Sequence, residues 1–136
     1  MKIPATLFLM ILALSCNSNK EYKKAADAQE AGTLFIRASL DGDYDKAKFY
    51  ILKDSENLYY LDKWKNNIYD KLSSKEKNEY EDASIRPVKI AAVNDSVADY
   101  IYTNSYKQKD TVVLKVVRVN NEWLVDFKQY LQGGKQ

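Results

Sequence analysis

The sequence predicts an α+β domain in which three to four N-terminal helices pack on one face of a twisted, four-stranded antiparallel sheet. Apolar residues recur at helical spacing as far as about residue 82, whereas from residue 88 they alternate at the spacing of strands. The later segments are rich in β-branched and aromatic residues and are separated by turns that contain Asn and Asp. We therefore expect every helix to precede every strand, and the short turns make the strands a meander.

Two helices are predicted before residue 54. Residues 25–40 form the first, because its apolar residues share one face: Ala28, Ala31, Leu34, Phe35 and Ala38. Gly42 ends this helix, and Asp43 can cap a short second helix that continues to about residue 53. The buried face of the second helix would consist of Tyr44, Ala47 and Ile51, and the small residues of the first helix would let the second pack closely.

Two more helices are predicted before the sheet. Asp54 and Ser55 are helix-start residues, and apolar residues follow at spacings of three, four and seven: Leu58, Leu61, Ile68 and Leu72, flanked by Trp64 and Tyr69. Ser73 and Glu76 have the spacing of a capping box, which predicts a short fourth helix that ends near Asp82.

Four strands are predicted over residues 88–93, 97–106, 111–119 and 123–128, with Pro87 at the start of the first. The third strand is apolar on both faces, which predicts a central position in the sheet. In the fourth strand, Trp123, Val125 and Phe127 form the buried face. Asp126 alternates with them, so we expect it to point to solvent.

The first sixteen residues have the layout of a secretory signal. Lys2 precedes an almost wholly apolar run over residues 3–14, which is too short to span a bilayer, and Ser15 precedes Cys16, the only cysteine. This pattern resembles the lipobox of bacterial lipoproteins, with Ala13 where a leucine usually stands. The resemblance implies removal of residues 1–15 and a lipid, such as palmitate, on Cys16. The protein would then sit on the outer or inner membrane of the bacterial cell envelope, on its periplasmic or surface side.

A flexible tether at residues 16–24 would join the lipid to a domain at residues 25–130, and residues 131–136 would form a disordered tail.

The composition of the chain argues against several functions. With 21 basic and 19 acidic residues the net charge is +2, so we expect no nucleic acid partner. The chain has no histidine, which removes the usual general base and the commonest zinc ligand, and its four glycines form no phosphate-binding loop. Asp41, Asp43 and Asp45 alternate as in a calcium loop but lack the glycine and glutamate of an EF-hand. We expect neither a metal nor a cofactor.

Two segments resemble a known superfamily. DGDYDKAKFYI, at residues 41–51, matches a Gly-Asp-Tyr-x-Lys-Ala pattern at Gly42, Asp43, Tyr44, Lys46 and Ala47. VNNEWLVDF, at residues 119–127, matches a Lys-Trp-x-Val-Asp pattern at Trp123, Val125 and Asp126, with Glu122 in place of the lysine. Over residues 25–130 the chain thus resembles small bacterial lipoproteins of the nuclear transport factor 2-like superfamily. The resemblance implies a cone-like fold whose curved sheet and long helix enclose a cavity, used for isomerase or dehydratase chemistry in some relatives and only for binding in others.

Two functions follow as hypotheses. The first is a non-catalytic binding or protein-interaction lipoprotein, whose candidate ligand contacts are Tyr44, Tyr50, Trp64, Asp99, Tyr100 and Tyr102. The alternative is a small isomerase-like or hydratase-like enzyme, in which a buried Asp99 or Asp126 is the base and Tyr44 or Tyr50 donates a hydrogen bond. Core packing is the competing interpretation of the aromatic residues. The expected partners are the membrane, through the lipid, and a small ligand, a peptide or an envelope protein; the superfamily resemblance adds a homodimer through the sheet face.

Overall fold

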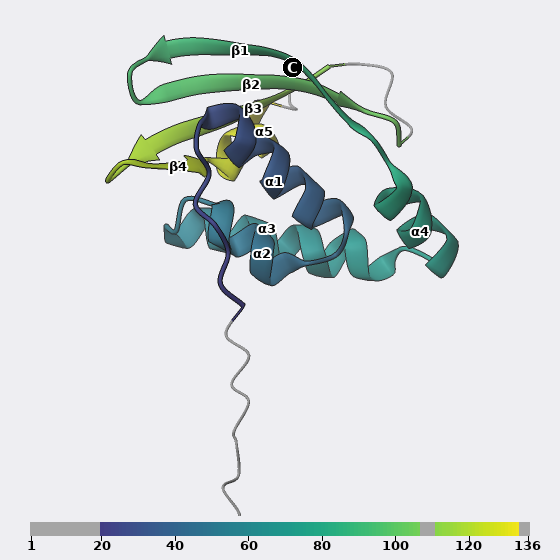
Figure 1. Ribbon diagram of the computed structural model, residues 1–136. Coiled ribbons are helices and arrows are strands. Elements are labelled where there is room, and N and C mark those ends of the chain that lie inside the picture. Colours follow the sequence, from purple (N-terminus) through teal and green to yellow (C-terminus); the bar gives the residue numbers. More distant parts are fainter. Residues whose placement is uncertain (1–19, 107–110, 134–136) are drawn as a thin grey trace, which may run out of the picture.

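The structure is a computed structural model that describes residues 20–106 and 111–133 (Figure 1). The predicted signal and Cys16 therefore lie outside the described residues. Helices α1 (Ala28–Leu40), α2 (Tyr44–Tyr50), α3 (Ser55–Asn67) and α4 (Ser74–Asp82) come first, with a 3-10 turn, η1 (Tyr69–Lys71), before α4. Strands β1 (Ile85–Asn94), β2 (Val97–Asn104), β3 (Val112–Val119) and β4 (Glu122–Val125) follow, and α5 (Phe127–Gly133) closes the described chain.

The strands form one antiparallel sheet in the order β1-β2-β3-β4, which is the predicted meander. The prediction of an α+β fold with N-terminal helices on a four-stranded sheet is confirmed. The sheet is neither closed nor strongly curled, so it does not form the cone that the superfamily resemblance implied (Figure 1). Helix α1 lies directly on the sheet and contacts all four strands, and α2 and α3 form a second layer beyond it (Figure 1).

Side-chain caps begin the helices at the predicted residues. The carboxylates of Asp43 and Asp54 accept from the backbone N–H three residues on, at 3.1 and 2.7 Å. Ser73 and Glu76 form the reciprocal capping box. Helix α1 begins at Ala28 rather than at residue 25, because Asp27 is its cap and accepts from the N–H of Glu30 at 2.8 Å.

Helix α2 ends at Tyr50, three residues before the predicted end. Ile51 instead forms a parallel bridge with Val125 of β4, and the Leu52 N–H donates to the Val125 carbonyl at 2.8 Å. The connection from α2 to α3 therefore runs beside β4, and α3 packs against α5, the helix that follows β4.

The turns of the sheet follow two different geometries. Asn120 and Asn121 have φ of 51° and 60°, as the tight turn between β3 and β4 requires. In the turn between β1 and β2, the Asn94 side chain accepts instead from the Ser96 N–H at 2.9 Å. Strand β1 starts at Ile85, and the register is irregular between Pro87 and Lys89, so the proline stands inside an edge strand.

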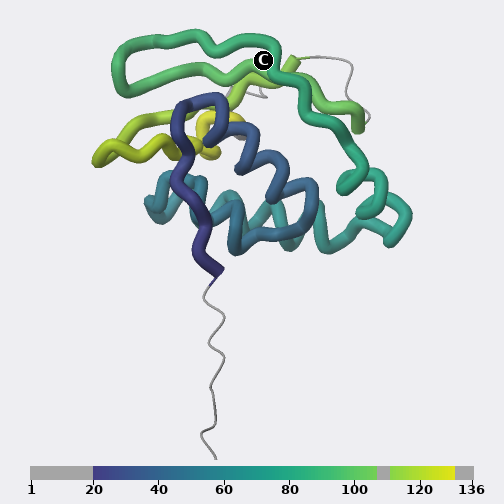
Figure 2. Tube along the Cα trace, viewed as in Figure 1, coloured from purple at the N-terminus to yellow at the C-terminus, as the bar shows by residue number. Residues whose placement is uncertain are grey.

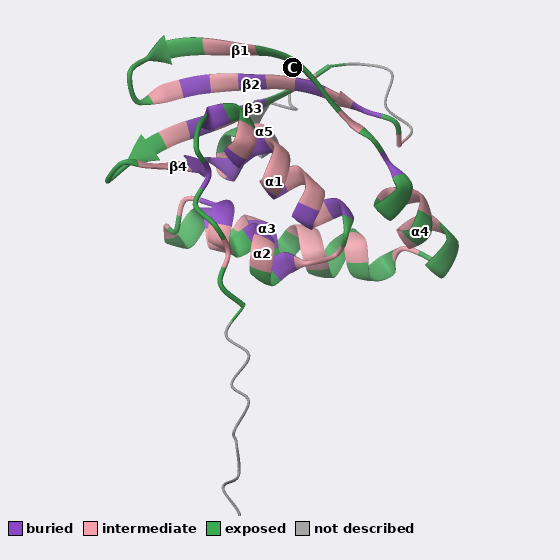
Figure 3. Cartoon of the chain, viewed as in Figure 1, coloured by how far each residue is buried: buried purple, intermediate pink, exposed green. Residues whose placement is uncertain are grey.

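Small residues let α1 approach the sheet closely. Gly32 of α1 lies over Tyr100 of β2, and a Cβ at Gly32 would overlap the tyrosine ring. Phe35 and Ala38 continue the buried face of α1 and belong to the same core cluster as Leu114 of β3. Figure 3 shows buried residues on α1 and along β2. Strand β3 pairs on both sides, as predicted. Its outer face is open, however, since Val113 remains 50% exposed.

The chain after Val125 departs from the prediction. Strand β4 ends there and α5 begins at Phe127, so the predicted strand over residues 123–128 is wrong in its last part. The Phe127 ring packs against Phe35 and Trp64, with ring centroids 5.4 and 6.0 Å apart, which favours a turn toward the helices. Asp126 is only 7% exposed, so the prediction that it points to solvent is also wrong. Residues 131–133 of the predicted tail belong to α5, and residues 134–136 lie outside the described residues.

Candidate ligand-binding cavity

A cavity of about 110 Å³ lies between the helices and the inner face of the sheet. Helix α1 forms one wall with Phe35, Ile36, Ser39 and Leu40, and β2 and β3 form another with Tyr102, Asn104 and Leu114. The remaining lining residues are aromatic and come from α3, α4, the end of β2 and α5: Trp64, Tyr80, Tyr106, Phe127 and Tyr130. Segments that are far apart in the sequence thus meet around one space.

Ring contacts hold the aromatic walls in place. Phe127 and Tyr130 are stacked, with centroids 5.7 Å apart and planes 12° apart, and the Trp64 ring stands edge-on to both. Two further lining residues, Tyr80 and Tyr106, meet edge to face with ring centroids 4.2 Å apart. Aromatic pairs in these geometries stabilise one another by about 0.5–1.5 kcal/mol beyond the burial of their area, which favours preformed walls.

The polar groups of the cavity are neutral. The Ser39 hydroxyl donates to the Phe35 carbonyl at 2.9 Å, and the Asn104 side-chain oxygen accepts from the Tyr106 N–H at 3.0 Å. Burial raises the pKa of Tyr80, Tyr102 and Tyr130 above the ordinary phenol value, so these side chains stay protonated at neutral pH. Among the described residues no carboxylate, lysine or arginine lines the cavity. This environment favours a neutral, mainly apolar molecule over a charged one.

Two of the six predicted contact residues, Trp64 and Tyr102, line this cavity. Tyr100 lies beside it in the core, where its ring stacks on Tyr102 at 5.3 Å and its hydroxyl is 2.8 Å from the Thr33 hydroxyl. Asp99 points to the other face of the sheet, where its carboxylate is 3.7 Å from the Lys115 ammonium. The alternation along β2 therefore separates Asp99 from the cavity.

Tyr44 and Tyr50 lie in the helical layer rather than at the cavity. The Tyr44 ring meets Tyr69 edge-on at 5.5 Å. Within the described part of the chain its buried hydroxyl has no hydrogen-bond partner, and burial raises the pKa of this phenol strongly. The Tyr50 hydroxyl donates to the Lys23 carbonyl at 2.7 Å. Both residues pack the helices, and Tyr50 also holds the chain that precedes α1.

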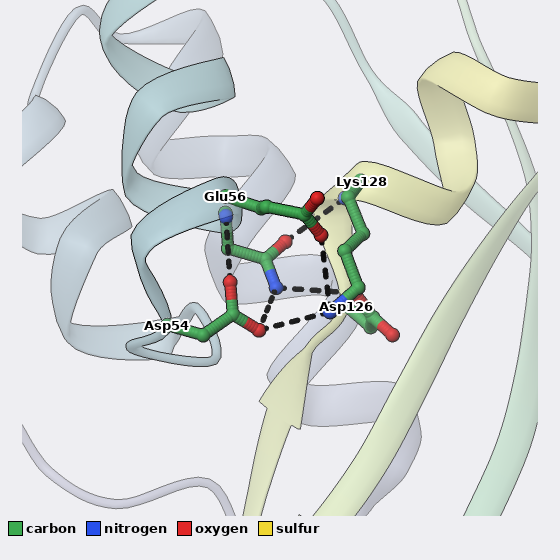
Figure 4. A network of polar contacts seen from close by, with 5 residues as sticks. Asp54, Glu56, Asp126 and Lys128 are labelled. Atoms are coloured by element: carbon green, nitrogen blue, oxygen red, sulfur yellow. Dashed lines mark hydrogen bonds and ion pairs between the residues drawn. The ribbon is translucent and has the colours of Figure 1, made fainter.

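A buried polar network joins α3 to the start of α5 (Figure 4). Asn57 is fully buried, and its Nδ2 donates to the Asp54 carboxylate at 3.0 Å and to the Asp126 carboxylate at 3.1 Å. Its Oδ1 accepts from the Lys128 N–H at 2.9 Å. The Lys128 ammonium lies 3.0 Å from Asp54, 3.8 Å from Asp126 and 3.9 Å from Glu56. Asp126 is therefore engaged in a structural contact between two helices.

The network also sets the protonation of its charged members. Hydrogen bonding from the Asn57 backbone N–H, and then from Lys128, lowers the pKa of Asp54 despite partial burial. The hydrogen bond to Asp54 raises the pKa of Lys128. Both groups are charged at neutral pH, and their pairing holds α5 in position over the cavity.

The enzyme hypothesis requires Asp99 or Asp126 as a general base, and neither carboxylate is at the cavity. Neither Asp99 nor Asp126 lines the aromatic cavity. A second, more open hollow of about 450 Å³ lies between the start of α1, the β1–β2 hairpin and Trp123, and it contains neither carboxylate. A carboxylate that does not reach a cavity cannot take a proton from a molecule bound there.

Sequence reasoning missed Asn57 and most of the cavity walls. Asn57 precedes Leu61 by one helical turn, so a polar residue on the buried stripe of α3 was the available signal. Phe127 was predicted on a strand and Tyr130 was assigned to no element, whereas both side chains reach the cavity from a helix.

Two searches of the described residues give negative results. No group of three or more acidic, cysteine or histidine residues in residues 20–106 and 111–133 has the arrangement of a metal site. In the same ranges, every helix is too short or too polar to cross a bilayer.

The fold and the cavity together define a small α+β domain with an aromatic-lined cavity between its helices and its sheet. Comparison of the chain with protein-family models, with curated proteins and with solved structures finds no match, so no family is identified.

Proposed function

We propose that the protein is a non-catalytic binding lipoprotein, held on an envelope membrane through Cys16, whose cavity takes a small, neutral, apolar or aromatic molecule. The observation that carries the proposal is the cavity of about 110 Å³ with walls of paired aromatic rings and neutral polar groups. An apolar cavity of about 150 Å³ is enough to bind benzene, so a space of the same order suits a molecule with a single ring. The enzyme alternative is less well supported, because its proposed bases lie elsewhere.

Membership of the nuclear transport factor 2-like superfamily is part of this proposal. Its support is the order of helices before a meander, together with the matches at Gly42 to Ala47 and at Trp123 to Asp126. Gly42 has φ of +73°, which explains a glycine at that position of the pattern. The sheet, which is neither closed nor strongly curled, is the feature that fits the superfamily least.

Thermal unfolding with a matched pair of probes tests the cavity. We expect toluene to raise the melting temperature of the protein and benzoate, which adds a charged group to the same ring, to leave it unchanged. Ser39→Leu places a larger side chain at the cavity wall and should abolish the toluene effect. Ser39→Ala, which removes the hydroxyl without filling space, should retain it. A toluene effect that survives in Ser39→Leu, or no effect in the unmodified protein, contradicts the proposal.

Mass spectrometry of the N-terminal peptide tests the lipid anchor. In a bacterium that produces the full chain, we expect the mature protein to begin at Cys16 with attached acyl chains and to sediment with membranes. Cys16→Ser should remove the acyl chains and release the protein from the membrane fraction. An unmodified Cys16 in a chain that retains residues 1–15 would refute the anchor.

A homodimer through the sheet is a further proposal with a surface available to it. In the described chain no helix lies on the outer face of the sheet, where Val113 is half exposed and Asp99 pairs with Lys115 (Figure 1). Analytical ultracentrifugation should show a dimer that Val113→Lys converts to a monomer, because two-fold symmetry would bury this added charge on both subunits. A monomer at all concentrations would remove this proposal. Peptides and envelope proteins would compete for the same face.

A further inference from the structure

Residues 22–24, which were predicted as the end of a flexible tether, are held against the helical layer and β4. The Tyr22 ring packs on Phe49 of α2 with centroids 5.5 Å apart, and the Lys23 carbonyl accepts the hydroxyl of Tyr50 at 2.7 Å. The Lys24 ammonium is 4.0 Å from Glu122, the first residue of β4. This segment therefore runs from the edge of the sheet across to α2, and the described chain begins on the side of the helices that faces away from the sheet (Figure 2).

The short distance in sequence from Cys16 to this docked segment limits how far the domain can stand from its anchor. Lys20 follows Cys16 by four residues. Four residues span at most about 14 Å when fully extended. A lipid on Cys16 would thus keep α2 close to the bilayer, whereas the sheet lies beyond two layers of helices, each about 10 Å thick. Turning the sheet toward the bilayer would require the tether to leave Phe49.

The outward side of α3 has residues that suit a membrane surface. Tyr59 is 55% exposed and lies opposite the buried residues Asn57 and Leu61 of the same helix. The Lys63 ammonium lies 5.3 Å from the centre of the Tyr59 ring. Tyrosine rings and lysine side chains concentrate at the level of lipid headgroups, because each has an apolar body and a polar end. On the neighbouring α2, the Lys48 ammonium lies 3.4 Å from the Asp62 carboxylate of α3, so this surface carries charges of both signs.

We infer that the docked tether orients the domain, so that α2 and α3 face the bilayer with Tyr59 and Lys63 at the headgroups, and the outer face of the sheet points to solvent. The inference rests on the proposed lipid anchor and names the surface that meets the membrane. It also leaves the outer sheet face, with Val113, accessible to a partner in solution.

Acetylation of lysines on vesicles tests this orientation. A chain that begins at Cys16 retains every described residue, and its single thiol can be coupled to a maleimide-bearing lipid in phosphatidylcholine vesicles. Mass spectrometry then gives the rates at which a water-soluble acetylating reagent modifies Lys63 on α3 and Lys89 on β1, both of which are exposed. Relative to the uncoupled chain, Lys63 should react more slowly; coverage of this surface for two-thirds of the time would correspond to an effect of about threefold. Lys89 should be unchanged. Equal slowing at both sites, no slowing, or slowing at Lys89 alone overturns the inference.

A pair of tether variants shows whether docking causes the orientation. Tyr22→Ala removes the ring that packs on Phe49 and should abolish the protection of Lys63. Glu21→Ala changes the exposed neighbouring residue and should preserve it. Full protection in Tyr22→Ala would overturn the role of the docked tether.

The two proposals fail in different ways. Because the lipid is attached chemically in this experiment, an unacylated Cys16 in the producing bacterium would refute the natural anchor but would not affect the measured protection of Lys63. Equal acetylation rates relative to the uncoupled chain at Lys63 and Lys89 would refute the orientation but would not contradict the lipid anchor.

Discussion

Replacing Asn57 by leucine should strongly destabilise the protein, because this residue joins α3 to α5. Its fully buried amide makes hydrogen bonds with two carboxylates, those of Asp54 and Asp126, and with the Lys128 N–H. Leucine has a similar size but can neither donate nor accept, so all three bonds are lost and the buried Asp126 keeps fewer partners.

The expected loss can be estimated from these contacts. A hydrogen bond to a charged group contributes about 1.5–3 kcal/mol and one between neutral groups contributes about 1 kcal/mol. Because the Asp54 side chain is 36% exposed, the lower end of each range applies. We expect the free energy of unfolding to fall by about 4 kcal/mol, which is a large part of the roughly 5–15 kcal/mol that stabilises a typical domain.

Urea denaturation followed by circular dichroism measures this loss. Asn66→Ala on the exposed face of α3 is the matched control, and we expect it to change the free energy of unfolding by less than about 0.5 kcal/mol. Asn57→Leu should lower the midpoint with little change in the slope. If Asn57→Leu and Asn66→Ala unfold at the same urea concentration, the network does not hold α3 to α5 and the reasoning fails.

Three further predictions concern packing, a buried hydroxyl and pH. Gly32→Ala should lower the free energy of unfolding by about 1–3 kcal/mol, because the added methyl group overlaps the Tyr100 ring. Gln29→Ala, on the exposed face of α1, is the control and should not destabilise the protein. Equal melting temperatures for the two variants would refute the close approach of α1 to Tyr100. Tyr44→Phe should leave the free energy of unfolding unchanged or raise it, because within the described residues the buried Tyr44 hydroxyl has no hydrogen-bond partner. Tyr100→Phe removes a hydroxyl that is paired with Thr33 and should lower the free energy of unfolding by about 1 kcal/mol. A larger loss in Tyr44→Phe than in Tyr100→Phe would contradict the packing of Tyr44. The lowered pKa of Asp54 means that its contribution to stability is complete above the ordinary carboxyl pKa of 3.8 and is lost as the pH falls through the folded value. Asp54→Asn retains an acceptor at the cap but cannot titrate, so its free energy of unfolding should decline less steeply below about pH 4 than that of the unmodified protein. Parallel curves of unfolding free energy against pH would show that the ionised Asp54 carboxylate does not stabilise the fold.

Local signals were sufficient where a residue acts on its own neighbours in sequence. Asp43, Asp54 and the Ser73–Glu76 box begin helices through bonds that span three residues, and Asn120 and Asn121 form a turn through their own backbone angles. These interactions require no knowledge of the tertiary structure. They predict the order of the elements, and with it the fold class.

The candidate site was only partly predictable, because a period of two tells which residues share a face but not what covers that face. Tyr100 and Tyr102 were correctly placed on one row of β2, yet only Tyr102 reaches the cavity, since Gly32 brings α1 directly onto Tyr100. Asp99, one residue away, lies on the opposite face.

The sequence by itself determined that this chain is an α+β domain with helices before a meander, and it predicts a lipid-bearing N-terminus. Only the tertiary structure decided the course of the chain after Val125, where contacts with Phe35 and Asn57 outweigh the strand preference of a few residues. The physical reason is range: caps and turns are closed by neighbours in sequence, whereas a cavity and a docked tether arise from surfaces that meet only after folding.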